Sequence, residues 1–137
     1  MRRFTLVALV AALALSLLAI PASARIDHHF STLTRNVAFT GDRDRFHLNA
    51  QLFAGFNQND QVGHLRLRCH SAASGKSRCA GFVKLNGEQG GFGFMSVRGN
   101  IGHGDMRLNV TGGTDDFDGV AGKVTGHGRF LHFDLVG

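Results

Sequence analysis

The chain has 137 residues, with 19 glycines, 12 phenylalanines, one proline and neither tryptophan nor tyrosine. A hydrophobic content of 43% with only 18% charged residues excludes a disordered chain. The glycines follow no period of three, which excludes collagen. The length suits one hydrophobic core rather than two domains.

The first 24 residues have the organisation of a secretory signal peptide. Arg2 and Arg3 form a positively charged start, residues 4–20 are almost entirely apolar, and Ala22-Ser23-Ala24 is an A-x-A cleavage site. The apolar run is shorter than the roughly 20 residues that a membrane-spanning helix needs. We therefore predict a signal peptide over 1–24, and a secreted, extracellular protein without a stable membrane anchor.

We expect residues 25–137 to form a single domain. Without Arg2 and Arg3, 13 basic residues stand against 10 acidic ones, which gives a net charge of +3. The basic residues are dispersed along the chain, so nucleic acid is not an expected partner. A weakly anionic cell surface is compatible with this small positive excess.

Cys69 and Cys79 are the only cysteines. An even number of cysteines in an exported chain favours a disulfide, and this one would close a short loop. A zinc site is not expected, because the chain has no second cysteine pair.

Apolar and polar residues alternate over several segments. In residues 45–53, every second residue from Phe46 to Leu52 is apolar. This period of two is typical of antiparallel strands with one buried face. Turn residues separate the segments, and Asn86-Gly87 is the strongest hairpin signal. We predict eight strands, at residues 34–40, 45–53, 61–70, 77–85, 90–98, 106–111, 119–125 and 129–136.

Short strands at this regular spacing predict an all-β sandwich or barrel. An eight-stranded antiparallel β-barrel removes the sheet edges that an exported protein would otherwise expose. Its interior is just wide enough for packed side chains or for one small ligand.

A glycine-rich segment at residues 108–124 carries a recognisable pattern. The residues concerned are Gly112, Gly113, Thr114, Phe117, Gly119, Val120, Gly122 and Val124. The segment resembles dirigent proteins and allene oxide cyclases, in which a strand runs into G-G-[ST]-G-x-[FY]-x-G-[AV]-x-G-x-[VA]. The glycines permit close crossing of strands, and the aromatic residue plugs the barrel end. Asp115 stands where the family usually has glycine, and aspartate tolerates a positive φ better than most residues.

A second region, residues 44–87, is similar in its order of segments to secreted bacterial proteins with an allene-oxide-cyclase-like barrel. The resemblance implies an eight-stranded barrel with a central cavity. It also implies a homo-oligomer, either a dimer or a trimer.

The resemblance does not extend to a catalytic site. Allene oxide cyclases use a carboxylate of the first strand in the barrel cavity, whereas residues 30–39 contain neither Asp nor Glu. No catalytic residue is therefore predicted, and any activity would be that of a cofactor-free isomerase or cyclase. No cofactor or metal site is predicted either, since Asp115, Asp116 and Asp118 do not complete a calcium-binding loop.

The most distinctive polar feature is a stripe on one side of a predicted strand, formed by His64, Arg66, Arg68 and His70. If this side faces the barrel cavity, the stripe forms an anion or phenol site, with His132 and Asp134 of the last strand as proton carriers. In the alternative arrangement the stripe faces solvent and the inward residues are Leu65, Leu67, Leu131, Phe133 and Leu135.

Three functions are compatible with these features. The first is a barrel that binds a small apolar or phenolic ligand in its interior. The second is a dirigent-like isomerase or coupling guide. The third is a structural or cell-surface interaction protein whose barrel is filled by side chains. The volume left inside the barrel distinguishes the third function from the other two.

The intact mass of the secreted protein checks both export and oxidation. We expect a chain that begins at Arg25 and lacks two hydrogens, because Cys69 and Cys79 are joined. Thiols that alkylate without prior reduction would contradict the bridge. A mass that still includes the first 24 residues would contradict the cleavage site.

Overall fold

The computed structural model describes residues 27–55 and 59–137. The predicted signal peptide lies outside the described residues, so its cleavage stays a prediction. Within the described ranges, no helix is long and apolar enough to cross a membrane.

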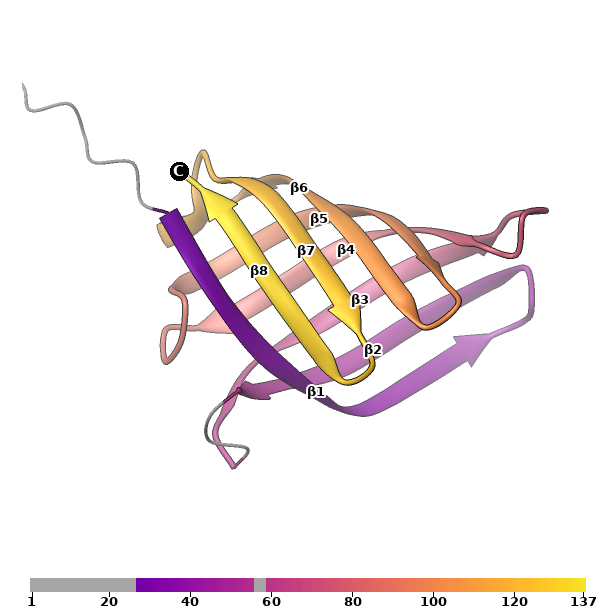
Figure 1. The fold of residues 1–137 in the computed structure, drawn as a ribbon, viewed down its shortest axis with the longest axis horizontal. Coiled ribbons are helices and arrows are strands. Elements are labelled where there is room, and N and C mark those ends of the chain that lie inside the picture. The colour runs from indigo at the N-terminus through magenta and orange to yellow at the C-terminus, as the bar shows by residue number, and fades with distance from the viewer. Residues whose placement is uncertain (1–26, 56–58) are drawn as a thin grey trace, which may run out of the picture.

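Eight antiparallel strands close into one barrel, in which each strand pairs with its neighbours in the chain and β8 pairs with β1 (Figure 1). The strands are β1 (Asp27–Gly41), β2 (Arg45–Ala54), β3 (Gln61–Ser71), β4 (Ser77–Asn86), β5 (Phe92–Gly102), β6 (Asp105–Gly113), β7 (Ala121–His127) and β8 (Phe130–Val136). A short 3-10 helix, η1 (Asp115–Phe117), follows β6. The eight-stranded all-β barrel predicted from the alternating segments is confirmed.

The largest difference from the predicted strands concerns β1, which begins at Asp27 instead of residue 34. Its first half is rich in histidine, serine and threonine, so no apolar alternation marks it in the sequence. This half pairs with β8, and the second half pairs with β2. A bulge between Arg35 and Ala38, with Asn36 at a φ of 51°, bends the strand between its two neighbours.

Apolar side chains fill the barrel. Every second residue of most strands points inward, and these residues form one continuous core. Of the two arrangements considered for the polar stripe, the structure has the one in which the stripe faces solvent. The inward residues of that arrangement are each at most 3% exposed: Leu65, Leu67, Leu131, Phe133 and Leu135. Burying one side chain of this size contributes roughly 1.5–3 kcal/mol. The opposite arrangement would lose this contribution and would also bury unpaired charges.

A disulfide joins Cys69 of β3 to Cys79 of β4, as the sequence predicts. The two residues lie directly opposite each other in the ladder, and both side chains are buried in the core. The bridge closes the β3–β4 hairpin, for which the chain-entropy estimate is a stabilisation of roughly 2–3 kcal/mol.

The glycine-rich segment after β6 closes one end of the barrel, as the resemblance implies. Phe117 of η1 is fully buried, and a side chain at Gly113 would collide with its carbonyl oxygen. Asp115 has a φ of 56°, so aspartate adopts a conformation there that favours glycine.

The close approach of strands expected at Gly119 and Gly122 occurs only at Gly122. An added Cβ at Gly122 would collide with the carbonyl oxygen of Asp134 on β8, and the φ there is +140°. The expectation is wrong for Gly119, where nothing lies within 4 Å of an added Cβ. A φ of +74° is the reason for glycine at that position.

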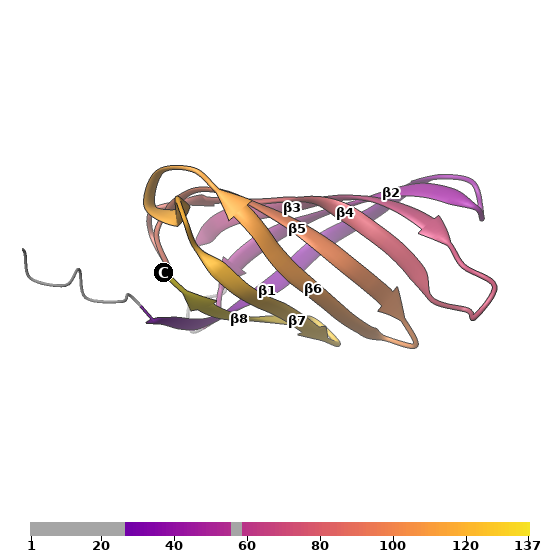
Figure 2. The same cartoon turned by 90° about the horizontal axis from the view of Figure 1, so that it is seen from above.

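The barrel is flared at the end where β1 leaves β8. In Figure 1 the second half of β1 runs away from the β7–β8 hairpin, and Figure 2 shows the β1–β2 and β3–β4 hairpins extending beyond the shorter strands. The pairing of β1 with β8 ends at Leu33. One residue later, the N–H of Thr34 donates to the carbonyl of Arg129 in the β7–β8 turn at 2.7 Å. From Asn36 onward, the only described strand that pairs with β1 is β2.

Substitution of Gly122 tests the crossing of β7 and β8. Gly122→Val should lower the free energy of unfolding by more than the ~1 kcal/mol typical of a point substitution, because the added side chain collides with a backbone carbonyl. Thermal unfolding followed by circular dichroism measures the effect. Gly112→Ala is the matched control, since nothing lies within 4 Å of an added Cβ at Gly112. Equal melting of Gly122→Val and the parent protein would contradict the close approach.

Candidate functional site

The polar residues proposed for the barrel interior lie on its outer wall. Arg66 and Arg68 are exposed and His64 is half-buried on the outside of β3, because the leucines between them occupy the inside. The prediction of a polar site in the lumen is therefore wrong. Among the residues that the structure describes, Thr32 is the only polar side chain classed as buried.

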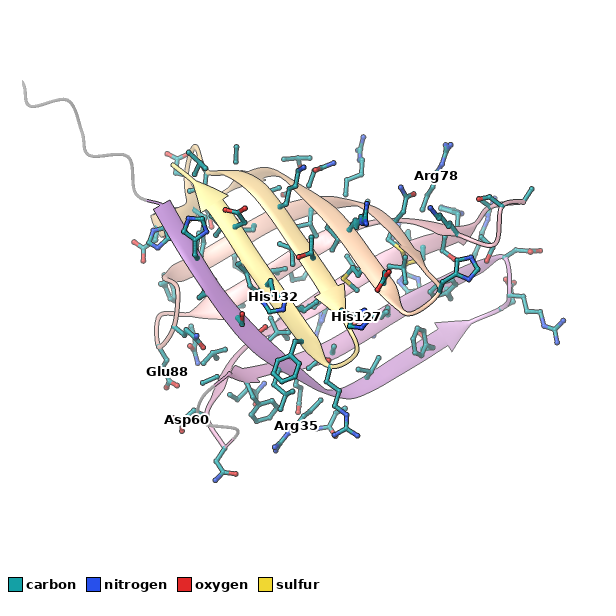
Figure 3. The ribbon with its side chains drawn as sticks, viewed as in Figure 1. Arg35, Asp60, Arg78, Glu88, His127 and His132 are labelled. Atoms are coloured by element: carbon teal, nitrogen blue, oxygen red, sulfur yellow. A yellow bond between two sulfur atoms is a disulfide. The ribbon has the colours of Figure 1, made fainter. Side chains whose placement is uncertain are left out.

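His132 and Asp134 also lie on the outer wall, but on β8, and β1 and β2 separate them from β3. Each has a partner on β1: His132 Nδ1 is 2.6 Å from the hydroxyl of Ser31, and Asp134 lies 2.9 Å from His29 Nδ1. Figure 3 shows His132 on the β8 side of the barrel and Arg78 projecting from β4 at the far end. The predicted convergence of these residues with the arginines of β3 is therefore wrong.

The outer wall of β2–β6 forms an open groove of about 1020 Å³. Four arginines from three neighbouring strands line it, together with asparagine, histidine and small residues. The arginines are Arg66, Arg68, Arg78 and Arg98. Two of these were named as candidates from the sequence, so the groove keeps part of the predicted site and adds residues to it.

The register of β3, β4 and β5 explains why the arginines gather. Ala80 of β4 lies directly opposite Arg68 on one side and Arg98 on the other. Two strand spacings separate the Arg68 and Arg98 backbones by about 10 Å. Arg78 lies two residues before Ala80 and so shares its face of the sheet. We call Arg68, Arg78 and Arg98 the arginine ring; Ala80 at its centre ends at Cβ and leaves the space above it open.

The outer face around the ring is strongly cationic. The outward positions of β2–β5 carry no carboxylate; their cations are Arg45, Arg66, Arg68, Arg78, Lys84 and Arg98. In the part of the chain that the structure describes, no carboxylate lies within salt-bridge distance of the arginine ring or of Arg66. The guanidinium groups therefore keep their charge and their hydrogen-bond donors available to a ligand.

The described carboxylates lie mainly at the ends of the barrel and on β8. Asp105, at the start of β6, lies 2.7 Å from His127 Nδ1, and this hydrogen bond lowers the pKa of the Asp105 carboxyl group. Asp42, in the β1–β2 turn, accepts the N–H groups of Arg45 and Asp44, which lower its pKa as well. Carboxylates elsewhere on the described surface stand beside basic groups, as Asp105 does beside Arg107, whereas the arginine ring has none nearby.

An aromatic cluster borders the groove. Phe82 forms edge contacts with the rings of His64 and Phe94, at centroid distances of 6.3 and 5.5 Å. The ammonium group of Lys84 lies 5.4 Å from the centre of the Phe94 ring. Burial lowers the pKa of His64, and the positive charges of Arg66 and Lys84 lower it further. The imidazole therefore experiences the positive potential of the groove.

Metal ligation is not apparent in the described ranges, which contain no group of three or more His, Cys, Asp or Glu side chains able to hold an ion. Two of the aspartates considered for calcium take part in the fold. Asp116 accepts the N–H of Phe92 at 2.8 Å, and Asp115 accepts the hydroxyl of Thr114 at 3.0 Å.

Sequence reasoning missed Arg78 and Arg98 as members of the site. Each occupies an outward position in a predicted strand. The predicted Cys69–Cys79 bridge aligns β3 with β4 and was a signal that could have placed Arg78 near Arg68. Nothing in the sequence aligns Arg98 with Arg68, because that alignment depends on the register across the β4–β5 turn. Asn86 pairs with Phe92, so Asn86-Gly87 begins a longer turn instead of forming the two-residue hairpin that its sequence favours.

No protein-family model matches the chain, and no curated protein matches its sequence. Several solved structures share its fold. Pyocyanin demethylase aligns with a TM-score of 0.58 and 16% identity over 80% of this chain and 99% of that one. The pterocarpan synthase dirigent protein PsPTS1 has a TM-score of 0.58 and 13% identity, over 83% and 94% of the two chains. The related GePTS1 has a TM-score of 0.56 and 12% identity, over 82% and 84%.

Identities of 12–16% establish a common fold and leave the chemistry undetermined. The comparisons confirm the architecture that the glycine-rich segment implied. The chain folds as an eight-stranded barrel of the dirigent and allene-oxide-cyclase-like type.

Proposed function

We propose that this protein is a secreted, non-catalytic barrel that binds oxyanions, such as phosphate or sulfate groups, on its outer wall. One observation carries the proposal: Arg68, Arg78 and Arg98 surround Ala80, and no carboxylate of the described residues lies within salt-bridge distance of them. Of the three functions considered from the sequence, this is the interaction protein with a filled barrel.

The filled interior weighs against a ligand inside the barrel. An apolar or phenolic molecule would have to displace packed side chains such as Leu65, Met95 and Phe133, which are almost completely buried. Such a site is normally preformed and concave. The groove of about 1020 Å³ lies outside, where polar and charged groups line it.

The interior also gives little support to a dirigent-like isomerase or coupling guide. Among the described inward positions the side chains are almost all apolar, so a general acid or base is missing from the lumen. Pyocyanin demethylase and the pterocarpan synthase dirigent proteins share the fold at identities that transfer no activity.

The disulfide supports the extracellular part of the proposal. Disulfides persist in oxidising compartments, and the Cys69–Cys79 bridge is buried within the core. A protein outside the cell meets phosphate and sulfate groups on anionic surfaces and polymers. The positive outer face would attract such groups before contact is made.

Arginine is well suited to this role. Its planar guanidinium group donates two parallel hydrogen bonds to an oxyanion and stays charged at all relevant pH values. A single tetrahedral anion above Ala80 would be within reach of up to three such groups. Hydrogen bonds to charged groups contribute roughly 1.5–3 kcal/mol each, so loss of two contacts should weaken binding at least tenfold.

Paired arginine substitutions test the site. Arg68→Gln/Arg98→Gln should weaken binding of inorganic sulfate, of heparin and of anionic phospholipid vesicles at least tenfold, as measured by calorimetry and co-sedimentation. The control Arg43→Gln/Arg129→Gln removes the same charge from the turns and should retain most of the affinity. Comparing the three probes distinguishes a free ion, a sulfated polymer and a lipid headgroup as the source of the oxyanion. If both double variants lost affinity equally, the loss would be explained by net charge alone, and the proposed site would be refuted.

Substitution of Ala80 provides a test that keeps every arginine. Ala80→Glu places a carboxylate inside the ring and should abolish sulfate binding, because the internal anion occupies the guanidinium groups. Ala80→Gln is the neutral control of the same size and should bind more strongly than Ala80→Glu. If Ala80→Glu binds sulfate as well as the parent protein, the ring is not the binding site.

The pKa of His64 should report an anion in the groove. In the free protein burial and the charges of Arg66 and Lys84 lower this pKa, and a bound oxyanion should raise it by offsetting the charge of Arg66. A pH titration of the imidazole resonances by NMR, with and without saturating sulfate, measures the change. Sulfate should leave the His64 pKa unmoved in Arg68→Gln/Arg98→Gln. A fall of the pKa on sulfate binding to the parent protein would contradict the proposed position.

A further inference from the structure

The cations of the outer wall continue beyond the arginine ring in a regular order. Strands β2 to β7 follow one another around the barrel wall (Figure 1), and their registers align outward residues in two parallel rows. The first row crosses the strands through His47, Arg68, Ala80, Arg98, Asn109 and Lys123. The second row crosses them through Arg45, His70, Arg78, Asn100, Arg107 and Thr125. The two rows lie two residues apart on every strand, which is about 7 Å.

Each of these six strands places one cation in the rows, and the row that holds it changes from strand to strand. The cation stands in the second row on β2, β4 and β6, and in the first row on β3, β5 and β7. The other position on each strand holds histidine or an uncharged residue. The six cations are Arg45, Arg68, Arg78, Arg98, Arg107 and Lys123. A path between the rows, which we call the cation track, therefore meets cations on alternating sides at intervals of about 4.8 Å.

Two hollows of the outer wall join along the cation track. The groove of about 1020 Å³ is lined from His47 on β2 to Asn109 on β6. A second hollow, of about 560 Å³, is lined from Asn100 on β5 to Lys123 on β7. The two hollows share Gly99, Asn100 and Asn109, so they form one open channel across the strands. Five strand spacings give the channel a length of about 24 Å, which far exceeds that of a single tetrahedral anion.

The carboxylates at the far end of the cation track are engaged with histidines. Asp105 stands beside the cation of β6, but its carboxyl group bonds to His127. Asp134 lies opposite the cation of β7, but it pairs with His29. Among the described residues, no carboxylate lies within salt-bridge distance of any of the six cations. The whole track can therefore offer its charge to a ligand.

We propose that the cation track binds a linear sulfated polysaccharide that runs across the strands, with its sulfate groups directed alternately to the two rows. The inference rests on the proposed function, because the arginine ring forms the middle of the track. An extended sugar chain advances by roughly one strand spacing per ring, so successive sulfates would meet successive cations.

The uncharged positions of the track favour a sugar chain over polyphosphate. Asn100 and Asn109 lie between the cations of β5, β6 and β7. A side-chain amide both donates and accepts hydrogen bonds, so it can bind the hydroxyl groups of a sugar in either direction. The repeating units of polyphosphate offer acceptors only and would leave the amide oxygens without a donor.

Heparin fragments of defined length test the cation track. Calorimetry should show binding that tightens about a hundredfold from the disaccharide to the hexasaccharide and changes little beyond it, because six rings span six strands. Inorganic sulfate is measured in parallel. If sulfate does not bind, the proposed function fails and this inference fails with it. If sulfate binds but the hexasaccharide binds no more tightly than the disaccharide, only the cation track is refuted.

Paired substitutions test the direction of the chain. Arg45→Gln/Lys123→Gln removes the outermost cations of the track, and Arg66→Gln/Lys84→Gln is the matched control, which removes two cations of the same outer wall that lie outside both rows. The first pair should weaken hexasaccharide binding at least tenfold. It should also lower the slope of the logarithm of the association constant against the logarithm of salt concentration by about two, because two ionic contacts are lost. The control should change both quantities less than half as much.

Three results of these measurements would overturn the proposal. A larger loss in Arg66→Gln/Lys84→Gln would mean that the chain runs along the strands instead of across them. Equal losses in the two pairs would mean that net charge alone attracts the polymer. Polyphosphate of matched charge that binds as tightly as the hexasaccharide would exclude a site built for a sugar chain. Circular dichroism confirms that each variant is folded, and the length series with the parent protein decides if one is not.

Discussion

The alternation of side chains around a closed sheet governs this structure. Since an eight-stranded barrel holds only a limited volume, its interior must be filled by one of the two faces of each strand. Leucine, valine, methionine and phenylalanine occupy that volume, and nearly all of them are buried. Once Leu65 and Leu67 point inward, Arg66 and Arg68 must point outward. The position of every polar group on β3 follows from that choice.

Filling the lumen moves the candidate chemistry to the outside of the barrel. Pyocyanin demethylase and the dirigent protein PsPTS1 share the barrel architecture, but the positive charge of the outer wall comes from the arginines of this chain. Several cations of the outer wall stand close together, and none of the described carboxylates pairs with the arginine ring. Repulsion between these cations stabilises the folded state less than a surface of mixed charges would. Clustered charge of this kind is more typical of a binding surface than of a stabilising one. The disulfide and the packed core supply stability elsewhere in the domain.

The bulge in β1 has two effects that act at opposite ends of the strand. It allows one strand to close the barrel against β8 and then to follow β2 beyond the rim. Closure removes one pair of sheet edges, whereas the extension beyond the rim leaves the side chains of Val37 and Phe39 exposed.

The number of strands, the residues that share a face of each strand and the disulfide pair could be predicted from the chain alone, because they depend on local periodicity and on residue chemistry. The closure of the barrel at Phe117 was implied by the resemblance of residues 108–124 to a known pattern. The tertiary structure decided which face is inside, because only closure of the sheet makes the leucine faces meet. It also decided the registers that bring Arg68 and Arg98 to either side of Ala80. Those registers depend on turn geometry and on packing between distant strands, and the turn beginning at Asn86 proved longer than its sequence indicated. The first half of β1 is polar, and it forms a strand because it pairs with β8. Pairing with a neighbour can hold a segment in a strand even where the sequence pattern of that segment does not predict one.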